Sequence, residues 1–184
     1  QSFKTMAITI NGDGTVTGLT SLPDSAMSVG SIVQVVQTVK TDTESNSTAN
    51  NTLWDYTGFN AAITTTGSNK VLVLVKLNAA IESGSNIFII LRKGGSDVTG
   101  AVASSVSSRS AATSGLRSTG GSEVEEASIH FLDSPGAGTH TYNLGFKHSD
   151  GGTKNIRVNR SHSDGDSYDY PRTVSSITLM EIKA

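Results

Sequence analysis

Cysteine is absent from this 184-residue chain, which excludes a disulfide framework and any zinc or redox site built on cysteine. The compartment stays open, because a surface protein can do without cysteine. Charged residues make up only 16% of the chain and the formal net charge is -2. Because no basic run is longer than the pair Arg92 and Lys93, the sequence gives no support to a nucleic-acid-binding surface.

Long apolar runs are also missing. The run "VLVLV" at 71–75 falls far short of the roughly 20 residues that a membrane-spanning helix needs, so we expect no membrane insertion. Residues 1–10 have neither the basic n-region nor the long apolar h-region of a signal peptide. The order "MAITI" predicts a natural start at Met6 with residues 1–5 added before it, and an in-frame upstream start is the alternative.

Helical periodicity is scarce, whereas turn-forming clusters are frequent. The 19 glycines gather with Ser, Thr, Asn and Asp in stretches such as "NGDGT", "TTGSN", "KGGSD", "SPGAG" and "SDGG". Between these clusters lie runs rich in Val, Ile and Thr. The candidate strands are 31–40, 52–57, 60–66, 70–81, 86–93, 125–133, 139–147, 155–161 and 175–183. This pattern predicts an all-β fold, a β-sandwich or barrel without a long α-helix.

Alternation of apolar and polar residues indicates which strands have one wet face. In "NIRVN" at 155–159, Ile156 and Val158 point to one side and the polar residues point to the other. The run 71–75 is apolar at every position, which predicts a strand covered on both faces, by a second sheet or by a neighbouring subunit. Together with the low charge of 30–40, this run predicts that one sheet packs against copies of itself in a homotrimer.

Two segments lack a sustained strand pattern. Residues 1–29 offer two short extended pieces around the turn signal "NGDG", and we expect them to form an N-terminal arm that serves as an attachment segment. Residues 30–184 then form the β-sandwich domain. The Ser- and Gly-rich stretch 101–122 predicts a long loop with one short strand near Val102.

A catalytic constellation is missing. The four histidines, His130, His140, His148 and His162, have no partner at the spacing of a known motif. The glycine-rich stretch 12–18 precedes no helix, so a phosphate there would lack a helix N-terminus. We therefore expect a protein that is not an enzyme, with no catalytic residue, no cofactor and no metal centre. A carbohydrate-active enzyme is an alternative that no residue pattern supports.

The acidic stretch "SHSDGDSYDYP" at 161–171 is the best candidate for a binding site. Asp164, Asp166 and Asp169 offer the hard oxygen ligands that calcium uses. The stretch lacks the closing Glu and the flanking helices of an EF-hand, and Asp, Gly and Ser dominate turns for backbone reasons alone. A solvated turn is the interpretation that we favour, and a calcium site is the alternative. The stretch "EVEE" at 123–126 is similarly interpreted as a solvated strand end.

Aromatic residues with a polar group are few. Trp54 and Tyr56 lie two residues apart, so both face the same side of a strand. Core packing or a subunit contact is the interpretation that we favour over a sugar-binding platform, because large rings bury much apolar area.

Three stretches of the chain resemble a known family. "GSIVQVVQTVKTDT" (30–43), "SNKVLVLVKLN" (68–78) and "YPRTVSSITLMEIK" (170–183) are similar to small virion structural proteins of bacteriophages, notably marine and cyanophage-like ones. The N-terminal "MAITINGDGTVTGL" (6–19) resembles the leader of such tail-associated proteins. The resemblance of the domain extends over 30–183, and it consists of similar stretches of sequence rather than catalytic motifs.

The resemblance implies a jelly-roll domain similar to the trimeric heads of the tumour necrosis factor and complement families. In such a sandwich the last strand runs through the centre of the inner sheet, so Ile177, Leu179 and Ile182 are expected to close the core. The alternation of that strand breaks between Met180 and Glu181. A β-bulge, or burial of Met180 in a trimer seam, would accommodate the break.

Two functions follow as expectations from the resemblance. The first is a tail fibre or tail-tip protein on the virion surface that contacts a host surface glycan or protein, and the second is a capsid decoration protein that stabilises the head. Both involve other virion proteins as partners, and neither involves nucleic acid. Because a rigid β scaffold leaves variable contacts to its connections, we expect the contact residues in the loops 161–171 and 101–122.

Overall fold

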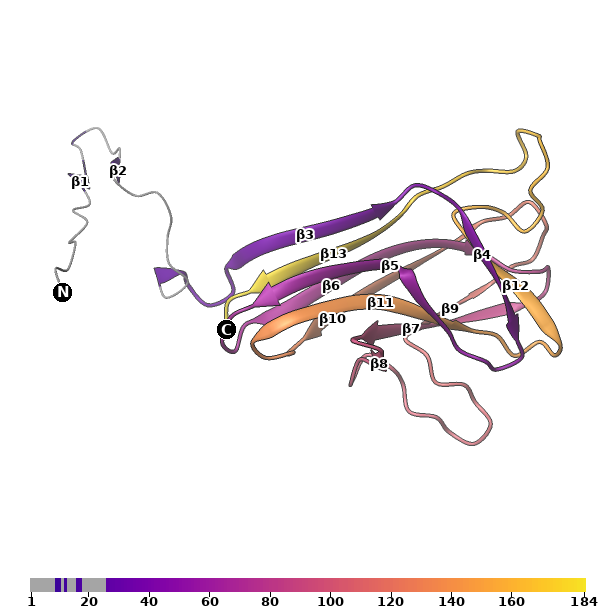
Figure 1. The fold of residues 1–184 in the computed structure, drawn as a ribbon, viewed down its shortest axis with the longest axis horizontal. Helices are drawn as coiled ribbons and strands as arrows, with labels where there is room; N and C mark the ends of the chain where they lie inside the picture. The colour runs from indigo at the N-terminus through magenta and orange to yellow at the C-terminus, as the bar shows by residue number, and fades with distance from the viewer. Residues whose placement is uncertain (1–8, 11, 13–15, 18–25) are drawn as a thin grey trace.

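The structure, a computed structural model, describes residues 9–10, 12, 16–17 and 26–184. In these residues two antiparallel sheets pack face to face and no α-helix is present, so the prediction of an all-β sandwich is confirmed (Figure 1). No helix in the described part is long and apolar enough to cross a membrane.

The larger sheet has six strands. They are β3 (Ile32–Lys40), β4 (Glu44–Ala49), β6 (Lys70–Ala80), β10 (Glu125–Asp133), β12 (Thr153–Val158) and β13 (Ser175–Ile182). Val75 of β6 pairs with both Ile129 of β10 and Ile177 of β13, so these two strands lie on opposite edges of β6. Further along β6, β12 takes the place of β13, and β4 takes the place of β3 at the outer edge.

The second sheet has five strands. They are β5 (Trp54–Thr65), β7 (Asn86–Lys93), β8 (Ser96–Asp97), β9 (Ser114–Arg117) and β11 (Gly138–Lys147). β11 pairs with β5 on one edge and with β7 on the other, and β8 and β9 share the free edge of β7. A separate two-stranded pair, β1 (Thr9–Ile10) and β2 (Val16–Thr17), lies around the "NGDG" turn signal. The two extended pieces expected there are therefore confirmed, whereas the rest of the arm up to residue 25 lies outside the described residues.

The core lies between the two sheets. Alternate residues of β6 (Val71, Val73 and Val75) are at most 3% exposed and pack against residues of the other sheet such as Ile89 and Phe146. Leu72 and Leu74 point to the opposite face of β6, where they are half-buried. Within one chain the apolar run 71–75 is thus covered fully on one face only.

The closing strand β13 lies between β3 and β6, in the interior of the larger sheet. Ile177 and Leu179 are buried in the core, as expected. The expectation for Ile182 is wrong, because the inward position belongs to Glu181, which is 1% exposed, and Ile182 lies on the outer face. The alternation therefore continues through Met180, and a register shift against β3 falls between Glu181 and Ile182. A buried carboxylate in place of an apolar residue explains why the pattern looked broken.

Three other features differ from the expectation. The candidate strands 52–57 and 60–66 form one strand, β5, whose extra residues are accommodated by a register shift against β11. No strand forms near Val102, and the strand of that stretch is β9 instead. The polar strand β4, "ESNSTA", was not expected, because it has no apolar alternation and depends on its pairing with β12.

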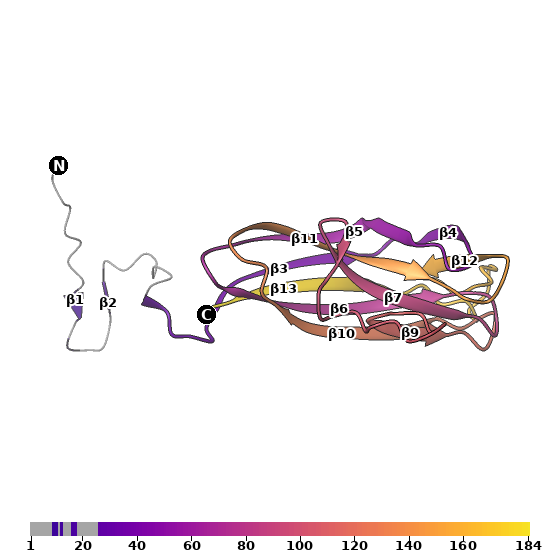
Figure 2. The same ribbon diagram turned by 90° about the horizontal axis from the view of Figure 1, so that it is seen from below.

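The sandwich has two distinct ends (Figures 1 and 2). At one end the chain enters β3 beside the end of β13, where the backbone N of Gly30 donates to the carbonyl of Lys183 at 2.8 Å. The long loop 159–174 between β12 and β13 lies at the opposite end. A segment that precedes residue 30 therefore joins the domain at the end remote from this loop.

Candidate functional site

The acidic stretch forms the outer part of the loop 159–174, but its carboxylates do not gather into a metal site. Asp164 accepts ion pairs from Arg160 Nη1 at 3.0 Å and from Arg172 Nη2 at 2.7 Å. Asp166 and Asp169 are exposed. The described residues contain no group of three acidic, His or Cys side chains placed to hold a metal ion. Asp164 therefore closes the loop on itself through two arginines, and the structure does not assemble the alternative calcium site.

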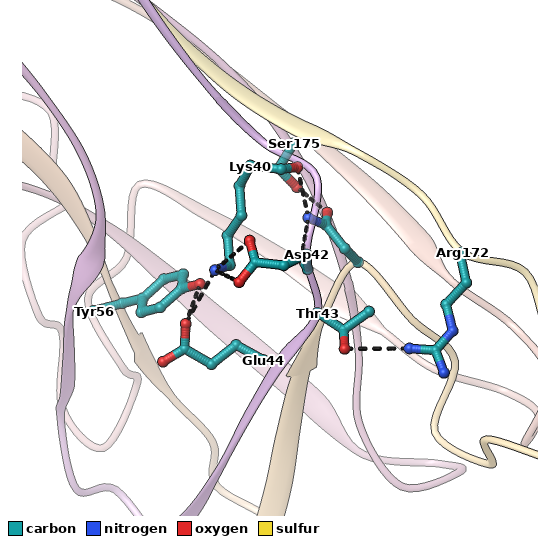
Figure 3. Close-up of polar contacts among 8 residues, drawn as sticks. Lys40, Asp42, Thr43, Glu44, Tyr56, Arg172 and Ser175 are labelled. Carbon is teal, nitrogen blue, oxygen red and sulfur yellow. Dashed lines mark hydrogen bonds and ion pairs between the residues drawn. The ribbon is translucent and has the colours of Figure 1, made fainter.

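A polar cluster at the corner between β3 and β4 holds the base of this loop (Figure 3). We call it the corner network, and its members are Lys40, Asp42, Glu44, Tyr56, Asn159 and Ser175. Buried Asn159 donates through Nδ2 to the carbonyls of Lys40 and Asp42 at 2.8 and 3.0 Å, and its Oδ1 accepts from Ser175 Oγ at 2.6 Å. The corner network thereby ties both ends of the loop 159–174 to the edge of the larger sheet.

Charge strengthens the corner network. Lys40 Nζ lies 3.0 Å from Asp42 and 3.2 Å from Glu44, and the hydroxyl of Tyr56 donates to Glu44 at 2.8 Å (Figure 3). Burial alone would lower the pKa of Lys40, but the two carboxylates raise it above its ordinary value. Burial, reinforced by Glu44, raises the pKa of Tyr56, so its hydroxyl remains a donor. The network thus connects the corner between β3 and β4 with β5 through Tyr56.

Two histidines and the Trp54–Tyr56 pair are held by internal contacts. His148 is fully buried and its Nε2 lies 2.7 Å from the carbonyl of Thr48. Burial, followed by the charge of Arg157, lowers the pKa of His162, whose Nδ1 lies 2.6 Å from Arg157 Nη1. The rings of Trp54 and Tyr56 lie 4.7 Å apart against the core. Core packing is thus confirmed for this pair.

The outer face of the larger sheet carries an apolar area near the end at which residue 30 enters. We call it the apolar face, and it consists of Ile32, Val35, Leu72, Leu132, Met180 and Ile182. Four of these residues form one cross-strand row, because Met180 pairs with Val35 and Leu72, and Leu72 pairs with Leu132. Val35 is 54% exposed and Leu132 is 47% exposed. Leu72 and Met180 between them are half-buried, so the row is a candidate for an interaction surface.

A polar pocket of about 430 Å³ lies under the loop that joins β8 to β9, on the outer face of the smaller sheet. We call it the serine pocket, and it is lined by Asn51, Ile90, Asp97, Ser105, Ser107, Ser108, Arg109, Ser110, Ala111 and Lys147. The loop covers Ile90, which points away from the core and is nevertheless only 2% exposed. The pocket therefore lies between an ordered loop and a strand surface.

Part of this pocket was expected and part was missed. Residues 105 and 107–111 fall within the stretch 101–122, where we expected contacts. Asn51 lies in the turn between β4 and β5, Lys147 is the last residue of β11, and Ile90 belongs to β7. No sequence pattern links them to the loop. The one local sign of the pocket in the sequence was Lys147, a basic residue directly before the turn that follows β11. No family model and no curated protein matches this chain.

Proposed function

We propose that this chain is a non-enzymatic structural protein of a phage virion surface, a tail fibre or tail-tip protein that contacts the host. The observation that carries the proposal is that the two ends of the sandwich differ. The chain enters at one end beside Lys183, and the loop 159–174 lies at the other. A domain attached through residues that precede Gly30 would present this loop outwards. The resemblance of residues 30–183 to phage virion proteins, and the implied jelly-roll fold, support the same role.

The proposed assembly is a homotrimer that buries the apolar face against neighbouring copies. The row from Val35 to Leu132 crosses the whole width of the sheet, and no described segment of the same chain covers it. An extended sheet face is better covered by a second folded domain than by a short peptide, because stable contacts bury more than roughly 1,000 Å². The outer face of the apolar run 71–75 then packs against a neighbouring subunit.

Immunogold electron microscopy of intact particles tests where the protein lies. We expect label at the tail tip or on fibres. Label distributed over the capsid would refute the tail role and support the decoration role, in which the segment that precedes Gly30 clasps neighbouring capsomers. Label on neither structure would contradict both.

Adsorption to host cells tests the role of the loop 159–174. Tyr168 is 99% exposed, and replacing it together with Asp166 and Asp169 by Ala leaves the ion pairs of Asp164 intact. We expect adsorption to be lost while the thermal midpoint changes little, because exposed turn residues each contribute within about 0.5 kcal/mol. Ser128→Ala, at an exposed position of β10, is the matched control. Unchanged adsorption of the triple variant would contradict a host contact through this loop.

A further inference from the structure

We infer that the serine pocket binds an acidic saccharide, a sugar chain that carries carboxylate groups. The inference deepens the proposed host contact and depends on it only for its biological setting. Its physical basis is the lining of the pocket, which combines hydroxyl groups with two cationic side chains.

The hydroxyl groups come from Ser105, Ser107, Ser108 and Ser110, which are all exposed. Within the described residues their side chains make no hydrogen bond. A serine hydroxyl both donates and accepts, and so does each hydroxyl of a sugar. An inorganic anion would use the donors only. Free hydroxyl groups that converge on one cavity therefore favour a polyhydroxylated ligand.

The cationic side chains favour a ligand that carries negative charge. Arg109 and Lys147 line the pocket, and in the described part of the chain neither forms an ion pair. Asp97 is the one acidic lining residue, and its Oδ1 is already bound by the guanidinium of Arg92. An arginine fork can hold a carboxylate through two parallel hydrogen bonds. The unpaired positive charge thus favours an acidic sugar over a neutral one.

The two ends of the loop are fastened before any ligand binds. The loop is fastened to β7 by two hydrogen bonds of Thr113, whose backbone N donates to the carbonyl of Ile89 at 2.7 Å and whose Oγ1 accepts from Leu91 N at 2.9 Å. Within the loop, Ala103 N donates to the carbonyl of Ala112 at 3.1 Å. Ile90 is only 2% exposed under the loop, so it supports the floor of the pocket rather than offering a contact surface. The volume of about 430 Å³ lies within the range of roughly 300–1,000 Å³ that small-ligand pockets have.

Calorimetry with the purified full chain tests the inference. The probes are disaccharides that contain glucuronate or galacturonate, and the same disaccharides with the carboxylate reduced to a primary alcohol. We expect the acidic probes to bind about tenfold more tightly than the reduced probes, because a hydrogen bond to a charged group is roughly twice as strong as one between neutral groups. Binding of the acidic probes should weaken as ionic strength rises.

Substitutions in the lining test whether the probes bind in this pocket. Arg109→Gln and Lys147→Gln should each weaken binding of the acidic probe about tenfold and leave binding of the reduced probe nearly unchanged. Ala111→Trp should abolish binding of both probes, because the indole fills the cavity from the loop side. Arg117→Gln, which removes an exposed arginine of β9 outside the pocket, is the matched control and should change nothing. A thermal melt of each variant verifies that it is folded.

Three results would overturn the inference. They are the absence of binding by any acidic probe, equal affinity for the acidic and the reduced probes, and equal weakening by Arg117→Gln and Arg109→Gln. None of these results bears on where the protein lies in a virion, which immunogold labelling decides separately. A failure of the saccharide site and a failure of the proposed tail role are therefore distinguishable.

Discussion

Replacement of Glu181 by Ala should strongly destabilise the sandwich. The carboxylate of Glu181 is buried on the inner side of β13 and accepts hydrogen bonds from residues of neighbouring segments, Gln34, Thr66 and Asn69 among them. Gln34 Nε2 donates at 2.6 Å, the backbone N of Thr66 donates at 2.9 Å, and Asn69 Nδ2 donates at 2.9 Å. These bonds connect the closing strand with β3 and with the turn between β5 and β6.

The magnitude follows from the number of these bonds. A hydrogen bond to a charged group contributes about 1.5–3 kcal/mol net, and a buried donor left without its acceptor costs about 1–3 kcal/mol. Because Gln34 can turn towards solvent, we count only the bonds from Thr66 and Asn69, and expect Glu181→Ala to lower the free energy of unfolding by about 4 kcal/mol. For a chain of this length, 1 kcal/mol shifts the thermal midpoint by about 2–4 °C, so the midpoint should fall by about 10 °C.

Thermal unfolding followed by the fluorescence of Trp54, the only tryptophan of the chain, measures this shift. Glu126→Ala is the control, because Glu126 is half-exposed and forms only a surface ion pair with Lys76 at 3.4 Å. Such a pair contributes within about 1 kcal/mol. If Glu181→Ala melted at the same temperature as Glu126→Ala, the hydrogen bonds of Glu181 would make no net contribution to stability.

Two further predictions concern acid stability and assembly. Burial alone would raise the pKa of Asp133, but hydrogen bonds from Lys93 at 2.6 Å and from Tyr142 at 2.7 Å hold it below its ordinary value. A carboxyl with a lowered pKa in the folded state stabilises above the unfolded pKa of about 4 and loses that contribution as the pH falls further. Denaturant titrations from pH 6 downwards should therefore show a smaller acid-dependent loss of unfolding free energy for Asp133→Asn than for the wild type. Equal losses would show that Asp133 makes no contribution to acid-dependent stability. Val35→Glu places a charge on the apolar face, and light scattering should then report a monomer. Gln37→Glu lies in the neighbouring, more polar row with Thr178 and His130, and should leave the proposed homotrimer intact. A trimer that persists in Val35→Glu would locate the contact elsewhere.

Much of the fold was predictable from local pattern. The candidate strands 86–93 and 125–133 coincide with β7 and β10, because runs rich in apolar residues between turn clusters indicate both the type and the limits of a strand. β4 was not predictable in this way. Its residues are polar, and it is a strand because β12 supplies the hydrogen bonds from Thr153 to Val158.

The candidate sites divide in a similar manner. The loops at 101–122 and 161–171 could be expected to carry contacts, because a high density of Gly, Ser or Asp favours turns and loops. Which of their side chains are free to act was not predictable. Asp164 is engaged by two arginines, whereas Arg109 is not engaged by any carboxylate in the described part of the chain. Ion pairs form between residues that lie close in space, and sequence spacing alone does not reveal that proximity.

The sequence by itself determined that this chain is a cysteine-free all-β protein whose strands have apolar and polar faces, because side-chain alternation along a strand is a local property. Only the tertiary structure decided that Glu181 points inwards, since donors to its carboxylate come from β3 and from a turn more than a hundred residues earlier in the chain. Only the tertiary structure brought Lys147 beside Arg109 to form a cationic pocket, because the pairing of β11 with β7 carries the lysine to the strand that the serine-rich loop covers.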